Sequence, residues 1–282
     1  MKIVRMAALI VLTLAITAFS VAYTGLGGRF TVTRLKAAAV SAIAPAGRNC
    51  RGYIALTFDD GPSATTPRLL AILTRAHATA AFFDVGAHEQ RYPAAVRQEA
   101  RIGQVGNHSY DHPFLDEMPY QAVYRELMGT GQITASLTGA TPWMFRPPFD
   151  RVGPQVTRAQ YQLGLDTVLW NVDSEDYDGI SPAAIVARVS HLHPGDVVLF
   201  HDGPPATLQA LPAVLTSLRR QGLCTGEILP SRHPHFAWPT QSYGNVVFYA
   251  RVAPPGTPLR PISGLSPAQL STAVVPASRQ GE

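Results

Sequence analysis

Short apolar runs alternate with longer amphipathic stretches through most of this chain. Strands are predicted where apolar and β-branched residues lie together between turn residues, at 53–58, 79–84, 103–106, 143–145, 165–170, 196–200 and, more weakly, 223–229. Helices are predicted where apolar residues recur every three or four positions, at 65–76, 92–101, 119–137, 154–163, 181–191 and 206–220. Strands and helices therefore follow one another in regular alternation.

This alternation predicts an α/β fold. A strand that is followed by a helix and another strand forms a parallel pair with a right-handed crossover. About seven such units in one continuous series favour a barrel over an open sheet. A doubly wound parallel sheet of similar content is the alternative.

The first 24 residues have the features of an export signal. Lys2 and Arg5 precede an uncharged apolar run over residues 6–23, whose length suits either a cleaved signal peptide or a spanning helix. Ser20 and Ala22 offer a cleavage site, but the run is long enough to remain as an anchor, which is the reading we favour. In both cases the positive charges before the run place the rest of the chain outside the cytoplasm, membrane-anchored or secreted.

Two other segments depart from the strand–helix pattern. Residues 25–49 carry Gly, Ala and scattered Arg, and they are expected to be a linker. Residues 231–282 are rich in Pro and Ser, and we expect a partly disordered extension in which residues 245–252 could form a short strand. Residues 50–230 remain as a single folded domain.

The charge pattern excludes one class of partner. The formal net charge is +4, but Lys and Arg are scattered along the chain and form no basic run. A protein that binds nucleic acid would carry a basic patch or stripe. We therefore expect no nucleic-acid partner, and we expect a monomer.

The two cysteines can be interpreted once export is assumed. Cys50 precedes the first predicted strand, and Cys224 follows the last strong helix. A disulfide between them would form in an oxidising compartment and would close a very long loop. Two free thiols are the alternative, and export makes that alternative the weaker one.

Two adjacent carboxylates end the first predicted strand. Asp59 and Asp60 follow the apolar run at 53–58 and precede Gly61-Pro62, which stops the strand. A metal ion beside one acid would hold it ionised and leave the other free to act as a base. A simple turn after the strand is the alternative, since Asp-Gly-Pro also favours one.

A pair of histidines follows another predicted strand. His108 and His112 are four residues apart, so on a helical turn both imidazoles would face one cation. Two unrelated surface histidines are the alternative. Two His and one carboxylate would leave coordination positions open, which suits a catalytic metal.

Three more polar segments follow strands at the same edge. They are Phe145-Arg146-Pro147-Pro148-Phe149, Trp170-Asn171-Val172-Asp173-Ser174-Glu175-Asp176-Tyr177 and Val197-Val198-Leu199-Phe200-His201-Asp202. The guanidinium of Arg146 can hold a carboxylate bidentately. Taken singly, Arg146 could form a surface ion pair, Asp173 could cap a helix, and His201 could be a core imidazole. Five polar segments at five strand ends favour one shared site instead.

In this order the segments resemble the five motifs of polysaccharide deacetylases, carbohydrate esterase family 4. The matching residues are Thr57-Phe58-Asp59-Asp60-Gly61-Pro62, His108-Ser109-x-x-His112, Arg146-Pro147-Pro148-Phe149, Asp173-x-x-Asp176-Tyr177 and Leu199-x-His201. The resemblance covers about residues 50–230, and the cysteine positions are most similar to those of secreted actinobacterial acetylxylan esterases and chitooligosaccharide deacetylases. It implies a distorted (β/α) barrel of seven or eight strands.

The resemblance also implies a role for each matching residue. Metal ligands would be Asp60, His108 and His112, most often for Zn²⁺, with Co²⁺ as the alternative. The catalytic set would be Asp59 as general base, His201 as general acid, Asp176 orienting His201, Arg146 holding Asp59, and the backbone N–H of Phe149 binding the oxyanion. Trp170, Tyr177 and Leu199 would line the acetyl pocket.

Three positions depart from the family pattern. Phe149 stands where Tyr is common, and Asp150 follows it where Gly is usual. Tyr177 replaces the usual Trp. Because none of these positions is an implied metal ligand, acid or base, we expect them to affect the substrate groove.

The leading interpretation is a metal-dependent hydrolase that removes N- or O-acetyl groups from an extracellular or cell-wall polysaccharide. Chitooligosaccharide, peptidoglycan and acetylxylan all remain open as substrates. One alternative is a non-catalytic envelope protein that binds carbohydrate on the same fold. Another is a non-haem iron oxygenase, against which export and the second adjacent Asp both argue.

Overall fold

The computed structural model describes residues 50–230 and 250–257. The expected export signal at 1–24, the linker at 25–49 and most of the extension at 231–282 lie outside the described residues. In the part of the chain that is described, no helix is both long enough and apolar enough to cross a membrane.

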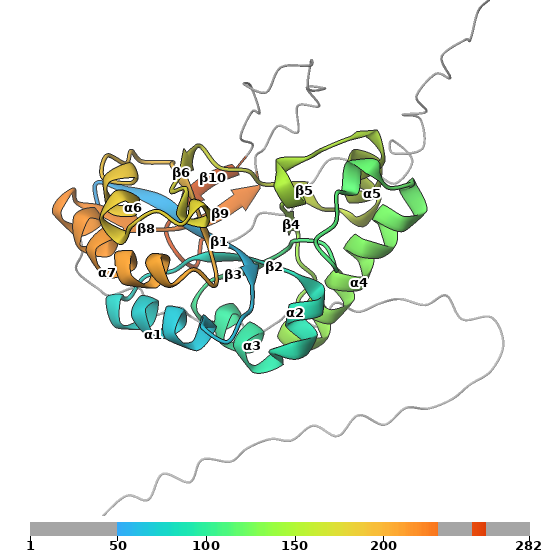
Figure 1. The fold of residues 1–282 in the computed structure, drawn as a ribbon, viewed down its shortest axis with the longest axis horizontal. Helices are drawn as coiled ribbons and strands as arrows, with labels where there is room; N and C mark the ends of the chain where they lie inside the picture. Colours follow the sequence, from blue (N-terminus) through green and yellow to red (C-terminus); the bar gives the residue numbers. More distant parts are fainter. Residues whose placement is uncertain (1–49, 231–249, 258–282) are drawn as a thin grey trace, which may run out of the picture. The chain divides into compact units, whose positions relative to one another are not determined.

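One parallel sheet lies at the centre of the fold (Figure 1). Its strands are β1 (Gly52–Gly61), β2 (Ala81–Asp84), β3 (Gln104–Asn107), β4 (Met144–Phe145), β5 (Asp166–Thr167), β6 (Val172–Asp173), β7 (Val197–His201) and β8 (Leu223–Thr225). They pair in the order β5-β4-β3-β2-β1-β7-β6, and β8 pairs with the first residues of β1. Every one of these pairs is parallel.

The strand order is that of a barrel that is open between β5 and β6. Strands β1 to β5 follow one another across the sheet, while β7 returns to the other side of β1 with β6 outside it. In a doubly wound sheet, the strand returning beside β1 would come earlier in the chain than the strand outside it. The predicted distorted (β/α) barrel is confirmed, and the doubly wound alternative is wrong.

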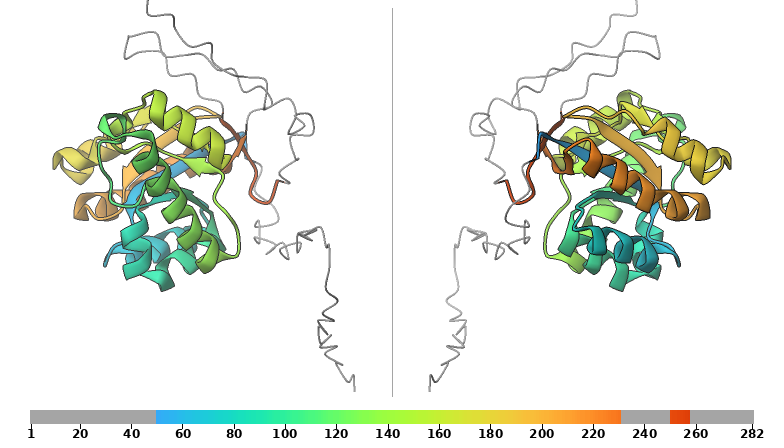
Figure 2. Two further views of the ribbon diagram at one scale, coloured as in Figure 1. Left: turned by 90° about the vertical axis from the view of Figure 1, so that its right-hand side faces the viewer. Right: turned by 90° about the vertical axis from the view of Figure 1, so that its left-hand side faces the viewer.

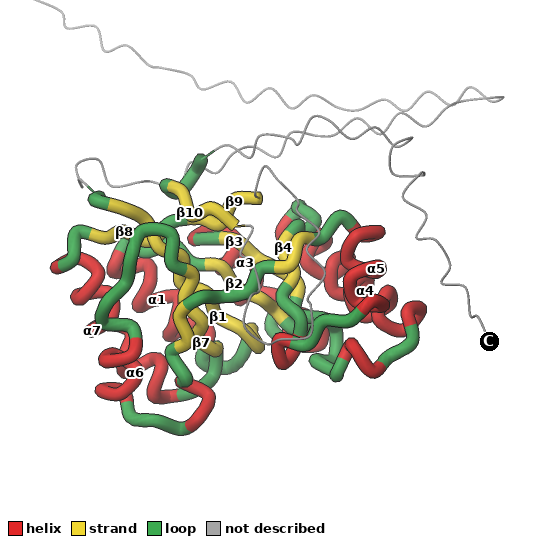
Figure 3. Tube along the Cα trace, turned by 90° about the horizontal axis from the view of Figure 1, so that it is seen from above, coloured by secondary structure: helices red, strands yellow, loops and turns green. Residues whose placement is uncertain are grey.

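Helices lie on the outside of the strands, as seen from two sides in Figure 2 and from above in Figure 3. In the described residues they are α1 (Thr66–Ala76), α2 (Gly86–Arg91), α3 (Pro93–Ile102), α4 (Tyr120–Thr138), α5 (Pro154–Leu163), α6 (Pro182–Arg188) and α7 (Pro205–Arg220). Three short 3₁₀ turns are η1 (Leu115–Glu117), η2 (Pro148–Asp150) and η3 (Asp176–Asp178). All six predicted helices are present within a few residues of their predicted ends.

Alternate residues of β1 face the two sides of the sheet. Ile54, Leu56 and Phe58 are fully buried in the core between the sheet and the helices. Ala55 belongs to a second, inner core. Because side chains alternate along a strand, Asp59 shares the side of Ala55 and lies at the carboxyl end of the inner face.

The predicted strand at 165–170 is wrong in its extent. The structure has two short strands there, β5 and β6, on opposite sides of the opening. Between them, the carbonyl oxygens of Val168 and Leu169 accept hydrogen bonds from the Arg146 side chain at 2.9 and 3.2 Å. A buried side chain thus replaces a neighbouring strand as the partner of these backbone acceptors.

The last part of the domain also differs from expectation. The weak strand near 223–229 is two strands, β8 and β9 (Glu227–Pro230), and β9 pairs antiparallel with β10 (Ala250–Ala253). Ile228 of β9 lies in the inner core with Ala55. The six-residue helix α2 was not predicted, because so short a segment shows little helical periodicity.

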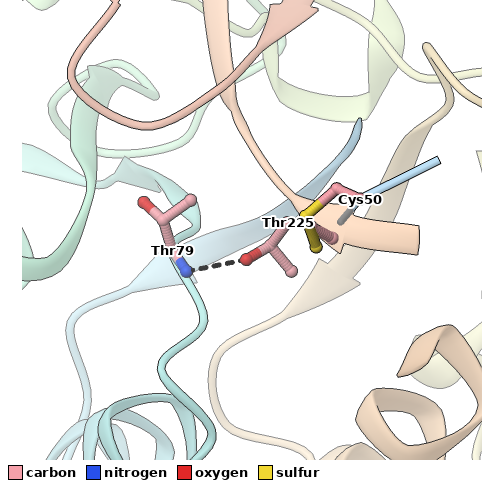
Figure 4. Close-up of a disulfide and its surroundings, with 4 residues drawn as sticks. Cys50, Thr79 and Thr225 are labelled. Atoms are coloured by element: carbon pink, nitrogen blue, oxygen red, sulfur yellow. Dashed lines mark hydrogen bonds between the residues drawn. A yellow bond between two sulfur atoms is a disulfide. The ribbon is translucent and has the colours of Figure 1, made fainter. Parts of the chain in front are cut away.

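A disulfide joins the amino end of β1 to β8. Cys50 and Cys224 are bonded, with their Cα atoms 5.7 Å apart, so the predicted pairing is present and both cysteines are used. Figure 4 shows the bond beside Thr225, whose hydroxyl accepts a hydrogen bond from the Thr79 N–H at 2.9 Å. The bond lies at the end of β1 opposite to Asp59 and Asp60.

Candidate active site and metal centre

The predicted site residues come from several strand ends and meet at one edge of the sheet. Asp59 and Asp60 end β1, and Asp59 pairs in register with His201, the last residue of β7. His108 follows β3, and Arg146 follows β4. This is the edge at which α/β barrels carry their functional side chains.

A β-bulge separates the roles of the two adjacent acids. The pairing of β1 with β2 passes from Asp59–Phe83 directly to Gly61–Asp84, so Asp60 has no partner. Asp60 takes a left-handed backbone conformation with φ 68°. In a regular strand neighbouring side chains point to opposite faces, whereas a bulge re-aims one of them. Both carboxylates can therefore reach the same site.

The two histidines reach this site from a loop and not from a helical turn. Residues 108–112 form no helix, and Ser109 and His112 have φ values of 64° and 56°, so the predicted helical arrangement is wrong. The loop is held instead by local bonds: Ser109 Oγ accepts from the His112 N–H at 3.1 Å. The predicted convergence is nevertheless present. Nε2 of His108 and Nε2 of His112 lie 3.4 and 3.2 Å from Oδ1 of Asp60.

Asp60, His108 and His112 form a donor set that fits a divalent metal. Their ligand atoms all lie within 4.8 Å of one another. Oδ1 of Asp60 is buried and makes no hydrogen bond, although the side chain is 42% exposed overall. Nδ1 of His108 donates to the carbonyl oxygen of Arg146 at 2.7 Å, so a neutral His108 presents a lone pair on Nε2. Two His and one carboxylate leave coordination positions open for water or substrate.

The ionisation of the ligands suits the same role. Burial raises the pKa of Asp60, but the adjacent imidazole of His108, with the charges of His201 and His112, outweighs it and lowers the pKa to about 2. Burial, together with the nearby charge of His108, lowers the pKa of His112. An ionised carboxylate and a neutral imidazole are the forms that bind metals.

Arg146 is fully buried and holds Asp59 through one hydrogen bond. Its Nη1 donates to Oδ1 of Asp59 at 2.7 Å and to the hydroxyl of Thr57 at 2.8 Å, while Nε and Nη2 donate to the carbonyls of Val168 and Leu169. The bidentate clamp considered from the sequence is absent. The guanidinium instead joins β1, through Asp59 and Thr57, to the backbone that follows β5. Burial lowers the pKa of Arg146 against the opposing charge of Asp59.

His201 is held by a carboxylate on its far side. Nδ1 of His201 lies 2.8 Å from Oδ1 of Asp176, and Oδ2 of Asp176 accepts from the His201 backbone N–H at 2.8 Å. The Thr207 hydroxyl donates to the same Oδ2 at 2.5 Å. Burial lowers the pKa of His201, but the hydrogen bond to Asp176 and the charge of Asp59 outweigh it and raise the pKa.

Phe149 presents a backbone N–H at the edge of the site. Phe149 and Asp150 both have φ 57°, an uncommon conformation for residues other than glycine. Within the described residues, the Phe149 N–H donates no hydrogen bond. The Phe149 ring lies edge-on to the candidate ligand His112, with ring centroids 4.6 Å apart. Asp150 is half-buried, and burial raises its pKa against the opposing charge of Arg146.

The three expected pocket residues lie around the same centre. The Tyr177 ring is edge-on to His201 at 5.2 Å between centroids, and its hydroxyl donates to Asp173 at 3.1 Å. The Arg146 guanidinium lies 5.2 Å from the centroid of a Trp170 ring. Leu199 is buried on β7, two residues before His201 and therefore on the same side.

Sequence reasoning missed several residues that support the site. Thr207 has no spacing signal, because it lies on the first turn of α7 and reaches Asp176 only in the folded chain. Asp202 follows His201 and accepts a hydrogen bond from Ser63 at 2.9 Å, which ties the turn after Asp60 to β7.

A cluster of buried acids behind the site was missed as well. Asp84, Glu89 and Glu99 are fully buried, and Thr134 donates to Glu89 at 2.6 Å. Burial, with the charge of Asp84, raises the pKa of Glu89 to about 9, and burial raises the pKa of Glu99 to about 8. The fold thus favours the protonated form of both glutamates. The helices that carry Glu89 and Glu99 contain other polar and charged residues, so no sequence pattern marks these two as buried.

Comparison with known proteins places this site in a family. A family model described as polysaccharide deacetylase matches residues 46–168. The chain is 38% identical over 187 residues to a bifunctional xylanase/xylan deacetylase of Cellvibrio japonicus, covering 66% of this chain and 28% of that protein. It is 32% identical over 197 residues to a peptidoglycan-N-acetylglucosamine deacetylase of Bacillus cereus, covering 66% of this chain and 92% of that protein. The chain thus spans less than a third of the first relative and nearly all of the second.

A solved structure agrees with these relatives. A family 4 carbohydrate esterase from Streptomyces lividans, in complex with acetate, is similar with a TM-score of 0.63 and 35% identity. The match covers 73% of this chain and 99% of that one. The resemblance inferred from the five motifs is confirmed, and the chain belongs to the polysaccharide deacetylase family, carbohydrate esterase family 4.

Proposed function

We propose that this protein is a metal-dependent hydrolase that removes acetyl groups from a polysaccharide outside the cytoplasm. One observation carries the proposal: the unbonded Oδ1 of Asp60 faces Nε2 of both His108 and His112, directly beside the ion-paired Asp59. Zn²⁺ is the proposed metal, with Co²⁺ as a functional substitute. A bound metal would supply Lewis acidity toward water and the acetyl carbonyl.

Asp59 is positioned to act as the general base. Its Oδ1 is occupied by Arg146 at 2.7 Å, while its Oδ2 faces Nε2 of His108 at 3.8 Å. Asp59 would take a proton as water attacks the acetyl carbon and the new C–O bond forms. The free N–H of Phe149 would donate to the oxygen that gains negative charge.

His201 is positioned to act as the general acid. Asp176 accepts from Nδ1 of His201, which leaves Nε2 to give a proton to the departing sugar nitrogen or oxygen as its bond to the acetyl carbon breaks. Asp59 ends the step protonated and His201 neutral, and the product leaves as acetic acid, which gives its proton to water and becomes acetate. The raised pKa of His201 favours the protonated form that this step requires.

The relatives suggest which polymers to test. One relative is named for xylan and another for peptidoglycan N-acetylglucosamine, so acetylxylan and peptidoglycan are proposed substrates. N-acetylchitooligosaccharide is the third proposed substrate. Residues 50–230 are the proposed catalytic domain, active as a monomer. Acetate release should be measured on all three substrates with added zinc, after chelation, and after zinc or cobalt is returned. Activity that persists after verified metal removal would contradict the proposal.

A non-catalytic carbohydrate-binding protein is the second reading. No observation favours it, because such a protein has no need for a base, an acid and a metal set in one place. Acetate release that disappears in Asp59→Asn, with polysaccharide binding retained, would exclude it.

A further inference from the structure

Large exposed hydrophobic side chains gather beside the candidate active site. Among the described residues, four such side chains are exposed: Phe114 (44%), Phe149 (52%), Tyr177 (52%) and Tyr161 (43%). Tyr177 lies against His201, and Phe149 lies against His112. Exposed apolar surface is unfavourable in water, so its concentration beside a site indicates a binding role.

Phe114 and Phe149 form one continuous aromatic strip. Their rings stack with centroids 4.2 Å apart and an angle of 28° between the planes. The strip begins at His112, whose ring contacts Phe149, and extends one ring farther from the metal ligands at Phe114. The next residue, Leu115, is fully buried in the core near α4 and α5, so the chain is anchored where Phe114 turns outward.

Contacts with Arg151 hold the Phe114 end of the strip. The guanidinium of Arg151 lies 4.8 Å from the centroid of the Phe114 ring. Arg151 is itself fixed by Asp116, through Nε at 2.9 Å, and by Glu117, through Nη2 at 2.8 Å. A surface that is ordered before binding loses less entropy when a ligand arrives. Because both carboxylates pair with Arg151, the strip offers no unpaired cation for an anionic ligand.

We propose that Phe114 and Phe149 form a binding subsite for an uncharged pyranose ring next to the sugar that loses its acetyl group. The apolar C–H face of such a ring would pack on the exposed surface of the two side chains. The subsite rests on the proposed function, since it assumes that a glycan chain crosses the metal centre. The subsite is best tested by substituting Phe114, because Phe149 would also contribute its backbone N–H to the reaction.

The subsite predicts a dependence on substrate length. Phe114→Ala should weaken binding of a tetrasaccharide by about tenfold, which corresponds to about 1.4 kcal/mol of lost apolar contact. Binding should be measured by calorimetry with zinc-loaded Asp59→Asn protein, so that no turnover occurs. The probes are N-acetylchitotetraose and acetylated xylotetraose. Phe114→Tyr should bind as the parent does, and Tyr161→Ala, which removes an exposed ring on α5, serves as the matched control.

A small ester separates this role from an indirect one. On 4-nitrophenyl acetate, whose ring cannot reach a second subsite, Phe114→Ala should leave kcat/KM unchanged in the otherwise unmodified enzyme. An equal loss on the small ester would show that Phe114 acts through the Phe149 backbone, and it would overturn the subsite. Unchanged tetrasaccharide binding, or no binding of either probe by the parent, would also overturn it. Phe114-dependent binding without acetate release from any polymer would support the subsite and reject the proposed function.

Discussion

Arg146→Met should destabilise the protein strongly, because Arg146 is a fully buried cation whose bonds join several strand ends. The side chain donates to Asp59, Thr57, Val168 and Leu169 at distances from 2.7 to 3.2 Å. Met fills much of the same volume but makes none of these bonds. The variant would leave the Asp59 carboxylate buried without its counter-charge.

The magnitude follows from the burial of the pair. The side chains of Arg146 and Asp59 are only 0% and 5% exposed, so solvent screens their interaction little. Removing one partner of a buried ion pair costs about 3–5 kcal/mol, and the other lost hydrogen bonds cost about 1 kcal/mol each. With the three other hydrogen bonds, to Thr57, Val168 and Leu169, we expect Arg146→Met to lower the free energy of unfolding by roughly 6–8 kcal/mol. Combining it with Asp59→Asn removes the unpaired charge and should recover about 2 kcal/mol.

Urea unfolding of four proteins tests this reasoning: the parent, each single variant and the double variant. The transitions should be followed by circular dichroism at neutral pH, with chelator present and the disulfide intact, so that metal binding does not contribute. Arg146→Lys keeps the charge but loses the planar fork, and it should fall between the parent and Arg146→Met. A cost below about 1 kcal/mol for Arg146→Met, or strictly additive effects in the double variant, would refute the account.

Three further predictions concern stability, the disulfide and the general acid. Folding raises the pKa of Glu89 to about 9 from its ordinary value of 4.5, so its stabilising contribution is complete at low pH and is lost as pH rises through that range. The free energy of unfolding should therefore fall between about pH 5 and 8, by up to about 1.4 kcal/mol per pH unit, and Glu89→Gln should flatten the slope measured by urea unfolding. Cys50→Ser with Cys224→Ser opens a loop of 174 residues and should lower the free energy of unfolding by about 5 kcal/mol in the chain-entropy model, whereas an unchanged urea midpoint would contradict this. Thr207→Val removes a hydrogen bond from Asp176 and should lower kcat about tenfold, shift the pH profile and leave KM unchanged, while Thr207→Ser retains activity; equal activity of both variants would show that Thr207 has no positioning role.

The order of strands and helices could be predicted because each repeats a strong local pattern. The run at 53–58 and the amphipathic stretch at 119–137 appear as β1 and α4 within a few residues. The extent of 165–170 could not be predicted, because the hydrogen bonds that end β5 come from Arg146, which is distant in sequence. The local sequence pattern shows which residues favour a strand, but it does not show which distant group will hydrogen-bond to their backbone.

The candidate site could likewise be predicted only in part from the sequence. The residue types at the ends of β1 and β3 correctly indicated that Asp60, His108 and His112 come together. The backbone that brings them together was not predicted: a bulge turns Asp60, and a loop with positive φ values turns His112. Asp and His adopt positive φ values more often than most residues, but such values are still uncommon, so the sequence does not show at which Asp or His the fold imposes one. Thr207 and the buried glutamates lack any spacing that would mark them in advance.

The central claim is that the two adjacent acids have separate tasks, Asp59 as the base and Asp60 as a metal ligand. Measuring both metal content and acetate release in two variants tests this claim most directly. Asp59→Asn and Asp60→Ala should each be purified, loaded with zinc, dialysed and assayed for bound zinc per chain. Asp59→Asn should keep the zinc of the parent and release no acetate, whereas Asp60→Ala should lose both. Loss of zinc in Asp59→Asn, or full zinc occupancy in Asp60→Ala, would contradict the account.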